Sequence, residues 1–240
     1  MLNNDSYFSI QWPAMPGIRT LISYKYNNLN FNLRDKANTN GIKNRETLEN
    51  HLLKKVFWLN QLHSNIVTDL DKSIIKLNAD ASFTRQKNKV CVSLTADCVP
   101  LLLTSTLGLF VSGIHAGWKG LHSEIIANTI KKINLQTDQI LCYIGPSICK
   151  EHYEVSNDIL LNFKELSENY RLFFCEIKNN KFLCDLKSIA KFQLLSLGVL
   201  EQNIFVSNEC TVCNNDKYFS YRKENNNGSY GVFASCIWME

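Results

Sequence analysis

The sequence lacks the features that usually divide a chain into several domains. It has four prolines among 240 residues, no Pro- or Ser-rich linker, no internal repeat and no low-complexity block beyond Asn-rich turns. Two stretches, residues 27–41 and 223–228, are typical of surface loops, and neither separates the chain into units. We therefore expect one domain over residues 1–240, because mixed α/β folds of this length often form a single unit.

The sequence also shows no pattern typical of a targeting signal or a membrane-spanning segment. Residues 1–10 contain Asn and Asp and have no basic region followed by an apolar run, so they do not have the form of a secretory signal. The longest apolar runs, such as residues 99–103, are far too short to cross a membrane. We expect a soluble, cytoplasmic protein with no membrane partner.

The charge is nearly balanced. Lys and Arg total 26 against 22 acidic residues, and the resulting net charge of +4 is dispersed along the chain. Nucleic-acid binding would need a basic stripe or cluster, so we expect no nucleic-acid partner. Apolar residues make up 45% of the chain, with 13 Phe, which is enough for a large core. The oligomeric state is not determined by these patterns.

The nine cysteines are odd in number and scattered, which argues against a secreted disulfide framework. In a reducing compartment we expect them to be buried apolar side chains or metal ligands. The four in apolar, strand-like segments are predicted to be buried: Cys91, Cys142, Cys184 and Cys236.

A C-x-x-C pair is formed by Cys210 and Cys213. A structural zinc site would need a second pair, and we find none at a useful spacing; a thioredoxin-like context is also missing. His122 and His152 have no matching partner in the sequence. We therefore predict that neither histidine is a metal ligand.

Short apolar runs bounded by turn residues alternate with helical patterns. The runs predict strands at residues 56–59, 66–67, 90–94, 101–104, 109–114, 140–144, 204–206 and 232–238. Helical spacing of apolar residues predicts helices at residues 125–133, after Ser156 as N-cap and after Asp185 as N-cap. Interleaved strands and helices indicate an α+β (mixed α/β) fold.

The most informative stretch holds two candidate metal ligands, Cys98 and His115. One predicted strand follows Cys98 and another precedes His115. The four residues 105–108 between these strands form a plausible hairpin turn, with Gly108 able to take a positive φ. If Thr104 and Leu109 face each other, an antiparallel ladder places Cys98 opposite His115. Both side chains would then project to one face, where a thiolate and an imidazole can share a metal ion.

Two readings of this pair remain open from the residues. A metal site is one, and zinc suits imidazole and thiolate ligands. The other is a metal-free pair in which the imidazole of His115 activates the thiol of Cys98 as a nucleophile. His63 follows another predicted strand, and its spacing alone does not bring it to this pair.

Motifs along most of the chain carry a family resemblance. They are Asn60-Gln61-Leu62-His63-Ser64, Thr95-Ala96-Asp97-Cys98-Val99-Pro100, His115-Ala116-Gly117-Trp118-Lys119-Gly120, Ile144-Gly145-Pro146-Ser147-Ile148-Cys149 with Tyr153-Glu154-Val155, and Phe219-Ser220-Tyr221-Arg222, together with Asn44-Arg45. With them the chain resembles the YfiH-like family, also known as the multicopper polyphenol oxidase laccase-domain family. The resemblance implies central β-sheets covered by helices.

The resemblance also implies a zinc site and an activity. The family's ligands fall on His63, Cys98 and His115, and three protein ligands leave the open position that catalytic zinc requires. The implied activities are phosphorolysis of adenosine, inosine or methylthioadenosine and deamination of adenosine, with nucleoside and phosphate as small-molecule partners. Copper is possible in place of zinc, because both accept these ligands. A single His/His/Cys site, however, cannot supply the several copper centres of a true laccase.

Further residues of these motifs are candidates for the site. Asp97 is predicted to act beside Cys98 and His115 in catalysis, by orienting a ligand or relaying a proton, although it could equally cap the turn. Lys119 lies in the segment Gly117-Trp118-Lys119-Gly120, which leads from a predicted strand into a helix and favours an anion site. Arg45 and Arg222 are candidates for phosphate or ribose contacts. Each could instead have a purely structural role. Cys149 is predicted to line the substrate pocket, with burial as a structural thiol as the alternative.

Three functions therefore remain. The first is a zinc-dependent purine nucleoside phosphorylase and deaminase, with a copper-dependent polyphenol oxidase as a variant. The second is a metal-free Cys98/His115 hydrolase acting on cell-wall precursors, which would survive chelation and be inactivated by thiol alkylation. The third is a binding protein in which zinc only stabilises the fold.

Overall fold

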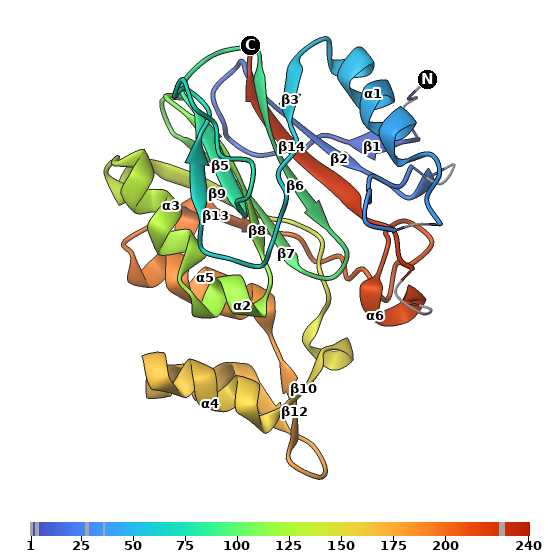
Figure 1. The fold of residues 1–240 in the computed structure, drawn as a ribbon. Coiled ribbons are helices and arrows are strands. Elements are labelled where there is room, and N and C mark those ends of the chain that lie inside the picture. Colours follow the sequence, from blue (N-terminus) through green and yellow to red (C-terminus); the bar gives the residue numbers. More distant parts are fainter. Residues whose placement is uncertain (1, 3–4, 27–28, 36, 226–228) are drawn as a thin grey trace.

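The computed structural model describes residues 2, 5–26, 29–35, 37–225 and 229–240. Its strands form a five-stranded sheet in the order β1-β2-β14-β6-β3, a six-stranded sheet in the order β13-β9-β7-β8-β5-β4, and a three-stranded sheet in the order β10-β12-β11 (Figure 1). Together with the helices they confirm the α+β class. That residues 1–240 form a single domain stays a prediction.

The elements have the following bounds. The strands are β1 (Tyr7–Phe8), β2 (Ile18–Ser23), β3 (Lys55–Phe57), β4 (Val67–Asp69), β5 (Ala81–Thr84), β6 (Lys89–Thr95), β7 (Val99–Ser105), β8 (Val111–Ala116), β9 (Ile140–Ile144), β10 (Glu154–Ser156), β11 (Phe174–Glu176), β12 (Lys181–Cys184), β13 (Ile204–Val206) and β14 (Phe233–Met239). The helices are α1 (Gly41–Leu52), α2 (Trp118–His122), α3 (Ile125–Ile133), α4 (Asn157–Leu166), α5 (Leu186–Ser196) and α6 (Tyr221–Glu224), with 3-10 turns η2 (Thr137–Gln139), η3 (Lys150–His152), η4 (Glu168–Phe173) and η5 (Glu201–Asn203).

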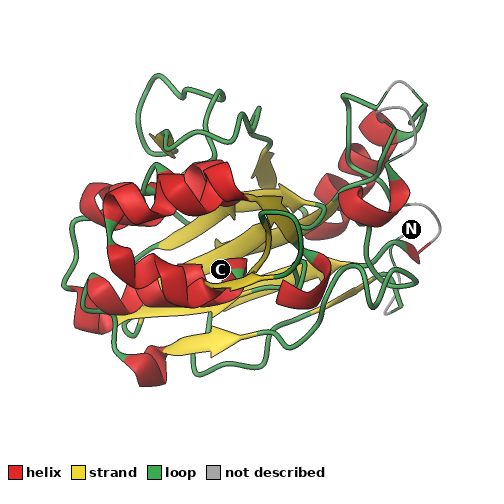
Figure 2. Cartoon of the chain, turned by 90° about the horizontal axis from the view of Figure 1, so that it is seen from below, coloured by secondary structure: helices red, strands yellow, loops and turns green. Residues whose placement is uncertain are grey.

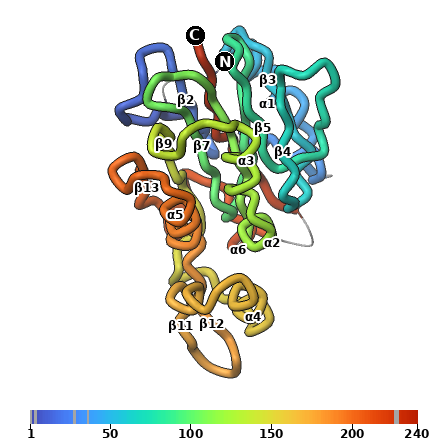
Figure 3. The backbone as a smooth tube through the Cα atoms, turned by 90° about the vertical axis from the view of Figure 1, so that its left-hand side faces the viewer, coloured from blue at the N-terminus to red at the C-terminus, as the bar shows by residue number. Residues whose placement is uncertain are grey.

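The two larger sheets pack face to face, with helices on their outer faces (Figure 2). Alternation along β7 shows how: Leu102 points into the core between the sheets, whereas Leu101 and Leu103 point to the apolar faces of α3 and α5. On the other side, α1 buries Leu48 against the outer face of the five-stranded sheet. The three-stranded sheet and α4 extend from this body (Figure 3).

Most predicted elements are confirmed. Each of the eight predicted strands has a counterpart, and α3, α4 and α5 occupy the predicted helical segments, with Ser156 and Asp185 at the N-cap positions. The carboxylate of Asp185 accepts the Ser188 N–H at 3.0 Å. The four cysteines predicted to be buried are buried.

The loop predictions are only partly right. Residues 27–28, 36 and 226–228 lie outside the described residues. The first predicted loop ends where α1 begins, and the second starts within α6. Helix α1 was not predicted because its sequence is mostly polar: Gly41 and Leu48 are its buried residues, which is too few to produce a helical apolar period.

The hairpin register was predicted wrongly by two residues. Thr104 pairs with Val111, so Pro100 lies opposite His115 in place of Cys98. The predicted turn does form, with Gly108 at φ +65°, but the Thr104 hydroxyl donates to the Phe110 carbonyl at 2.7 Å and keeps two more residues in the loop. Because side chains alternate with a period of two, a shift of two residues leaves Cys98 on the face of His115.

Strand directions bring six loops to one end of the six-stranded sheet. Strand β7 is antiparallel to β8 and β9, β8 is antiparallel to β5, β5 is parallel to β4, and β9 is parallel to β13. This end therefore collects the chain after β13, after β9 and after β8, and the chain before β7, β5 and β4. Within the described residues, no helix is both long and apolar enough to cross a membrane.

Candidate metal centre

The three predicted ligands meet at this end of the sheet. One ligand atom from each of His63, Cys98 and His115 lies within 4.8 Å of the others. The Sγ atom of Cys98 is 3.7 Å from Nε2 of His63, and the two imidazole rings lie 4.7 Å apart between centroids, nearly perpendicular at 79°. His63, which spacing could not place, arrives from the loop before β4.

A buried carboxylate that the sequence analysis missed orients both histidines. The Nδ1–H of His115 donates to Oδ1 of Asp80 at 2.8 Å, and the same oxygen accepts a hydrogen bond from the backbone N–H of His63 at 2.9 Å. The other oxygen accepts the N–H groups of Leu62 and Ser64, at 3.1 and 2.7 Å, and the Ser64 hydroxyl at 2.6 Å. Asp80 thus holds the His63 loop, where His63 adopts φ +58°, and turns Nε2 of His115 toward Cys98.

The electrostatics of the cluster favour charged forms. Burial raises the pKa of Asp80, but the hydrogen bond and charge of His115, with Ser64, lower it to about 2. Burial likewise raises the pKa of the Cys98 thiol, whereas the charge of His115 and hydrogen bonds from His115 and His63 lower it to about 6. Cys98 is therefore a thiolate near neutral pH, which is the form that binds metals and attacks electrophiles.

Gly117 leaves the space that the cluster needs. A Cβ atom at this position would lie 2.8 Å from Cδ2 of His63 and 2.9 Å from Sγ of Cys98. Contacts this short would displace one of the two ligands. The His-Ala-Gly-Trp motif therefore has a steric reason for its glycine.

The donor set fits a metal ion. Two imidazoles and a thiolate suit zinc, and three protein ligands leave one position open to the cavity. A carboxylate on the outer nitrogen of a ligand histidine, as Asp80 provides here, is a regular feature of zinc sites. The same three donors also accept copper.

The cluster opens into a cavity of about 840 Å³, within the range of small-molecule sites. All three ligand residues line it, and so do the predicted residues Asp97, Arg45, Lys119 and Arg222. The described lining also includes five aromatic side chains: Trp58, Trp118, Tyr153, Tyr221 and Tyr230.

Among the described residues, four cationic side chains line the cavity, including Arg34, which was not predicted. Arg45 donates to the Phe31 carbonyl at 3.1 Å, and Arg34 donates to the Gln61 carbonyl at 2.8 Å. Arg222 donates to the Glu154 carbonyl at 3.1 Å. In the part of the chain that the structure describes, none of Arg34, Arg45, Lys119 and Arg222 forms an ion pair with a carboxylate. Their charge is therefore available to an anionic ligand.

Hydrogen bonds hold Asp97 in a fixed position next to Cys98. It takes φ +84°, and its carboxylate accepts the Thr211 hydroxyl and the Arg222 N–H, both at 2.6 Å. Its carbonyl accepts the Ile148 N–H at 3.0 Å. The residue before Cys98 is thus fixed by three other segments. Its role in catalysis stays a prediction.

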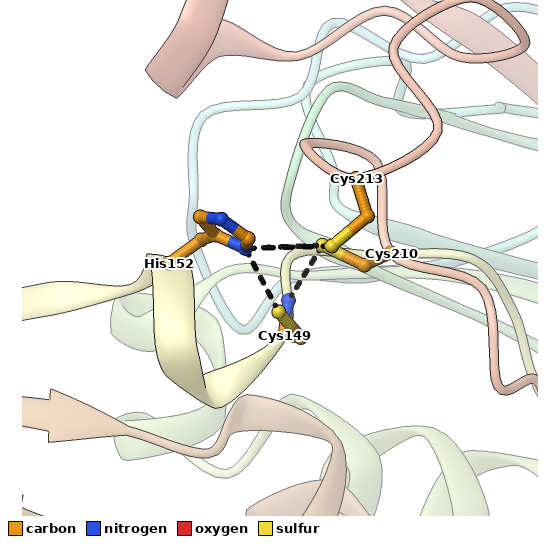
Figure 4. Close-up of side chains that lie close together, drawn as sticks. All are labelled: Cys149, His152, Cys210 and Cys213. Atoms are coloured by element: carbon orange, nitrogen blue, oxygen red, sulfur yellow. Dashed lines mark hydrogen bonds between the residues drawn. The ribbon is translucent and has the colours of Figure 1, made fainter.

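Cys149 is not among the residues that line the cavity, because it turns toward His152, with Sγ 3.1 Å from Nδ1. The prediction that His152 and the C-x-x-C pair lack partners is wrong. Cys149, His152, Cys210 and Cys213 place one ligand atom each within 4.8 Å of one another (Figure 4). The sequence spacing did not indicate this second cluster, because pairing of β9 with β13 brings its two halves, residues 149–152 and 210–213, together.

Comparison with known proteins agrees with this architecture. The chain belongs to the family described as multi-copper polyphenol oxidoreductase laccase, whose model matches residues 19–240. The purine nucleoside phosphorylase of Haemophilus influenzae is 36% identical over 219 residues, which cover 88% of each chain. The purine nucleoside phosphorylase YfiH of Escherichia coli is 30% identical over 241 residues, covering 95% of this chain and 97% of that protein.

A solved structure shows the same fold. The crystal structure of a Neisseria meningitidis protein superposes with a TM-score of 0.90 at 31% identity, covering 98% of this chain and 99% of that one. The resemblance to the YfiH-like family is thereby confirmed.

Proposed function

We propose that this protein is a zinc-dependent purine nucleoside phosphorylase that also deaminates adenosine. The observation that carries the proposal is the His63/Cys98/His115 cluster at the wall of an 840 Å³ cavity whose lining includes the cations Arg34, Arg45, Lys119 and Arg222. Relatives named purine nucleoside phosphorylase, at 36% and 30% identity, support it. Nucleoside and phosphate are the proposed partners, and the cytoplasm is the proposed compartment.

The cavity offers complementary surfaces to both substrates. Guanidinium groups such as those of Arg45 and Arg222 can bind phosphate oxygens in pairs, and Lys119 adds a point charge. Aromatic walls such as Trp58 and Tyr153 can pack against a purine ring. In phosphorolysis a phosphate oxygen forms a bond to ribose C1′ while the bond from C1′ to the purine nitrogen breaks. The purine leaves with that electron pair and takes a proton.

The chain's own residues prepare the reacting end of the cavity. When bound, zinc supplies Lewis acidity and a lowered pKa for water, which is the chemistry that deamination requires. Cys98 and His63 would hold it with Nε2 of His115, whose orientation Asp80 fixes. The thiolate of Cys98 would supply the negatively charged donor of this set.

Metal content and turnover measured on the same samples test this proposal. Wild type, Cys98→Ala and the matched control Cys175→Ser, an exposed cysteine outside both clusters, would be assayed with adenosine in phosphate buffer. We expect adenine and ribose 1-phosphate, together with inosine and ammonia, from wild type and the control. Both activities should disappear in Cys98→Ala.

Other outcomes would support the rival functions. Turnover by a chelated, metal-free wild type, with loss on thiol alkylation, would overturn the proposal and favour the Cys98/His115 hydrolase. Oxidation of phenols by the copper-loaded protein without nucleoside turnover would favour the polyphenol oxidase. Bound metal with no turnover of any kind would favour a binding protein.

A further inference from the structure

The second Cys/His cluster lies outside the cavity and is not used by the proposed function. We propose that Cys149, His152, Cys210 and Cys213 bind a structural zinc ion. The four side chains converge on one point, with sulfur and nitrogen atoms facing one another (Figure 4).

Distances within the cluster match tetrahedral zinc. With zinc–sulfur bonds of about 2.3 Å and zinc–nitrogen bonds of about 2.1 Å, a sulfur and a nitrogen ligand lie about 3.6 Å apart. From Nδ1 of His152 the sulfur atoms of Cys149, Cys213 and Cys210 are 3.1, 3.6 and 3.9 Å away. A single ion can therefore reach all four donors with small side-chain adjustments.

Sheet topology explains why the donors meet. Strands β9 and β13 are parallel neighbours, with Ile144 paired to Val206, so the chain leaves both strands at the same end. A parallel bridge between Ser147 and Cys210 continues the pairing, and the Thr211 N–H donates to the Ser147 carbonyl at 3.3 Å. A C-x-x-H pair then follows one strand and a C-x-x-C pair follows the other. This is the paired spacing of structural zinc sites.

The environment is that of a closed site near the surface. Four protein ligands fill a tetrahedral zinc and leave no position for substrate, and none of the four residues lines the cavity. The Cys149 N–H donates to Sγ of Cys210 at 3.2 Å, which stabilises a thiolate. Cys210 is buried, whereas His152 and Cys213 are exposed, so an ion can enter from solvent.

The site would brace the neighbouring cavity wall. Ile148 and Thr211, each adjacent to a ligand, donate hydrogen bonds to Asp97, the residue before Cys98. Zinc would fasten together the two loops that hold Asp97. Its expected effect is on stability and on the geometry around Asp97, with no direct part in the reaction.

The test counts zinc in a background without the first site. The double variant His63→Ala/Cys98→Ala leaves His115 as the one remaining first-site ligand. In it we expect about one zinc per chain by mass spectrometry. Adding His152→Ala or Cys213→Ser should remove that zinc, while adding Cys175→Ser, the matched exposed control, should leave it. Because both substituted side chains are exposed, circular dichroism should show that the variants remain folded.

Two further readouts distinguish a metal site from clustered thiols. Cobalt loading of the double variant should give thiolate-to-cobalt absorption that disappears with His152→Ala or Cys213→Ser. A chelator should lower the melting temperature of the double variant but not that of its His152→Ala derivative. These measurements do not involve turnover, so they are independent of the proposed function.

Three results would overturn the inference. One is a double variant without zinc. Another is a zinc content that neither His152→Ala nor Cys213→Ser changes. The third is a disulfide among Cys149, Cys210 and Cys213 in metal-free protein that cannot be loaded after reduction.

Discussion

Two Cys/His clusters occupy the same end of the six-stranded sheet and differ in what surrounds them. The cluster of His63, Cys98 and His115 offers three candidate ligands and faces an 840 Å³ cavity. The cluster at the ends of β9 and β13 offers four candidate ligands and lies outside that cavity. Imidazole and thiolate are common to both, so the number of ligands and access to the cavity separate a candidate reactive site from a candidate structural one.

The two clusters are also assembled differently. The first draws each ligand from a separate segment and relies on Asp80, a buried carboxylate, to orient two of them. The second uses two short pairs, each with its ligands three positions apart, and needs only the two strands β9 and β13 to be neighbours. The first should therefore be sensitive to distant substitutions, and the second to its own ligands.

The largest expected effects come from single thiols in the two clusters. Cys98→Ala should abolish turnover and keep the zinc of the second cluster. Cys213→Ser should keep most of the turnover but lower the free energy of unfolding by about 4 kcal/mol when free zinc exceeds its Kd by about 1,000-fold. Kinetics and thermal unfolding of both variants, with Cys175→Ser as control, measure the difference. The comparison breaks if Cys213→Ser also abolishes turnover.

Limited chelation should remove the two ions in order. A closed site surrounds its ion with four protein donors, whereas a three-ligand site leaves an open position that a chelator can occupy. With increasing chelator, turnover should disappear while about one zinc per chain remains, and the second zinc should leave only afterwards. Metal content, activity and unfolding followed together would show this order. Simultaneous loss of both ions would mean that the sites are not distinct in accessibility.

Asp80→Asn should weaken the first cluster alone. Asparagine has an amide nitrogen in place of one carboxylate oxygen, and this nitrogen cannot accept hydrogen bonds from the backbone N–H groups that hold the His63 loop. The negative charge opposite His115 is also lost. Substitution of such outer partners typically costs about 10–100-fold in metal affinity or activity. Zinc titration should show this loss at one site only. Asp71→Asn is the matched control, because Asp71 binds Thr84 and Lys89 away from both clusters.

Gly117→Ala should have the smallest effect of the four. Its Cβ would meet His63 and Cys98 within 3 Å, and overpacking of this kind costs about 1–3 kcal/mol. At the lower end of that range, metal binding at the first cluster weakens about fivefold. Gly120→Ala is the control, since its Cβ would have no neighbour closer than 3.5 Å. Equal zinc affinity of the Gly117→Ala and Gly120→Ala proteins would contradict the steric role of Gly117.

The sequence by itself determined the class of the fold and much of the first cluster. Apolar runs and helical spacing act over a few residues, so they predicted eight strands, three helices and four buried cysteines. The prediction that Cys98 and His115 share a face survived a register error of two residues, because strand side chains alternate with that period. The family motifs added His63.

The tertiary structure decided the rest, because it depends on which strands become neighbours. Asp80 precedes a strand, β5, that lacked a clear pattern, and only its pairing with β4 and β8 brings the carboxylate to both histidines. Cys149 and Cys210 are 61 positions apart and meet through the parallel pairing of β9 and β13. Local periodicity contains no information on such pairings, so the second cluster could be recognised only after the chain was folded.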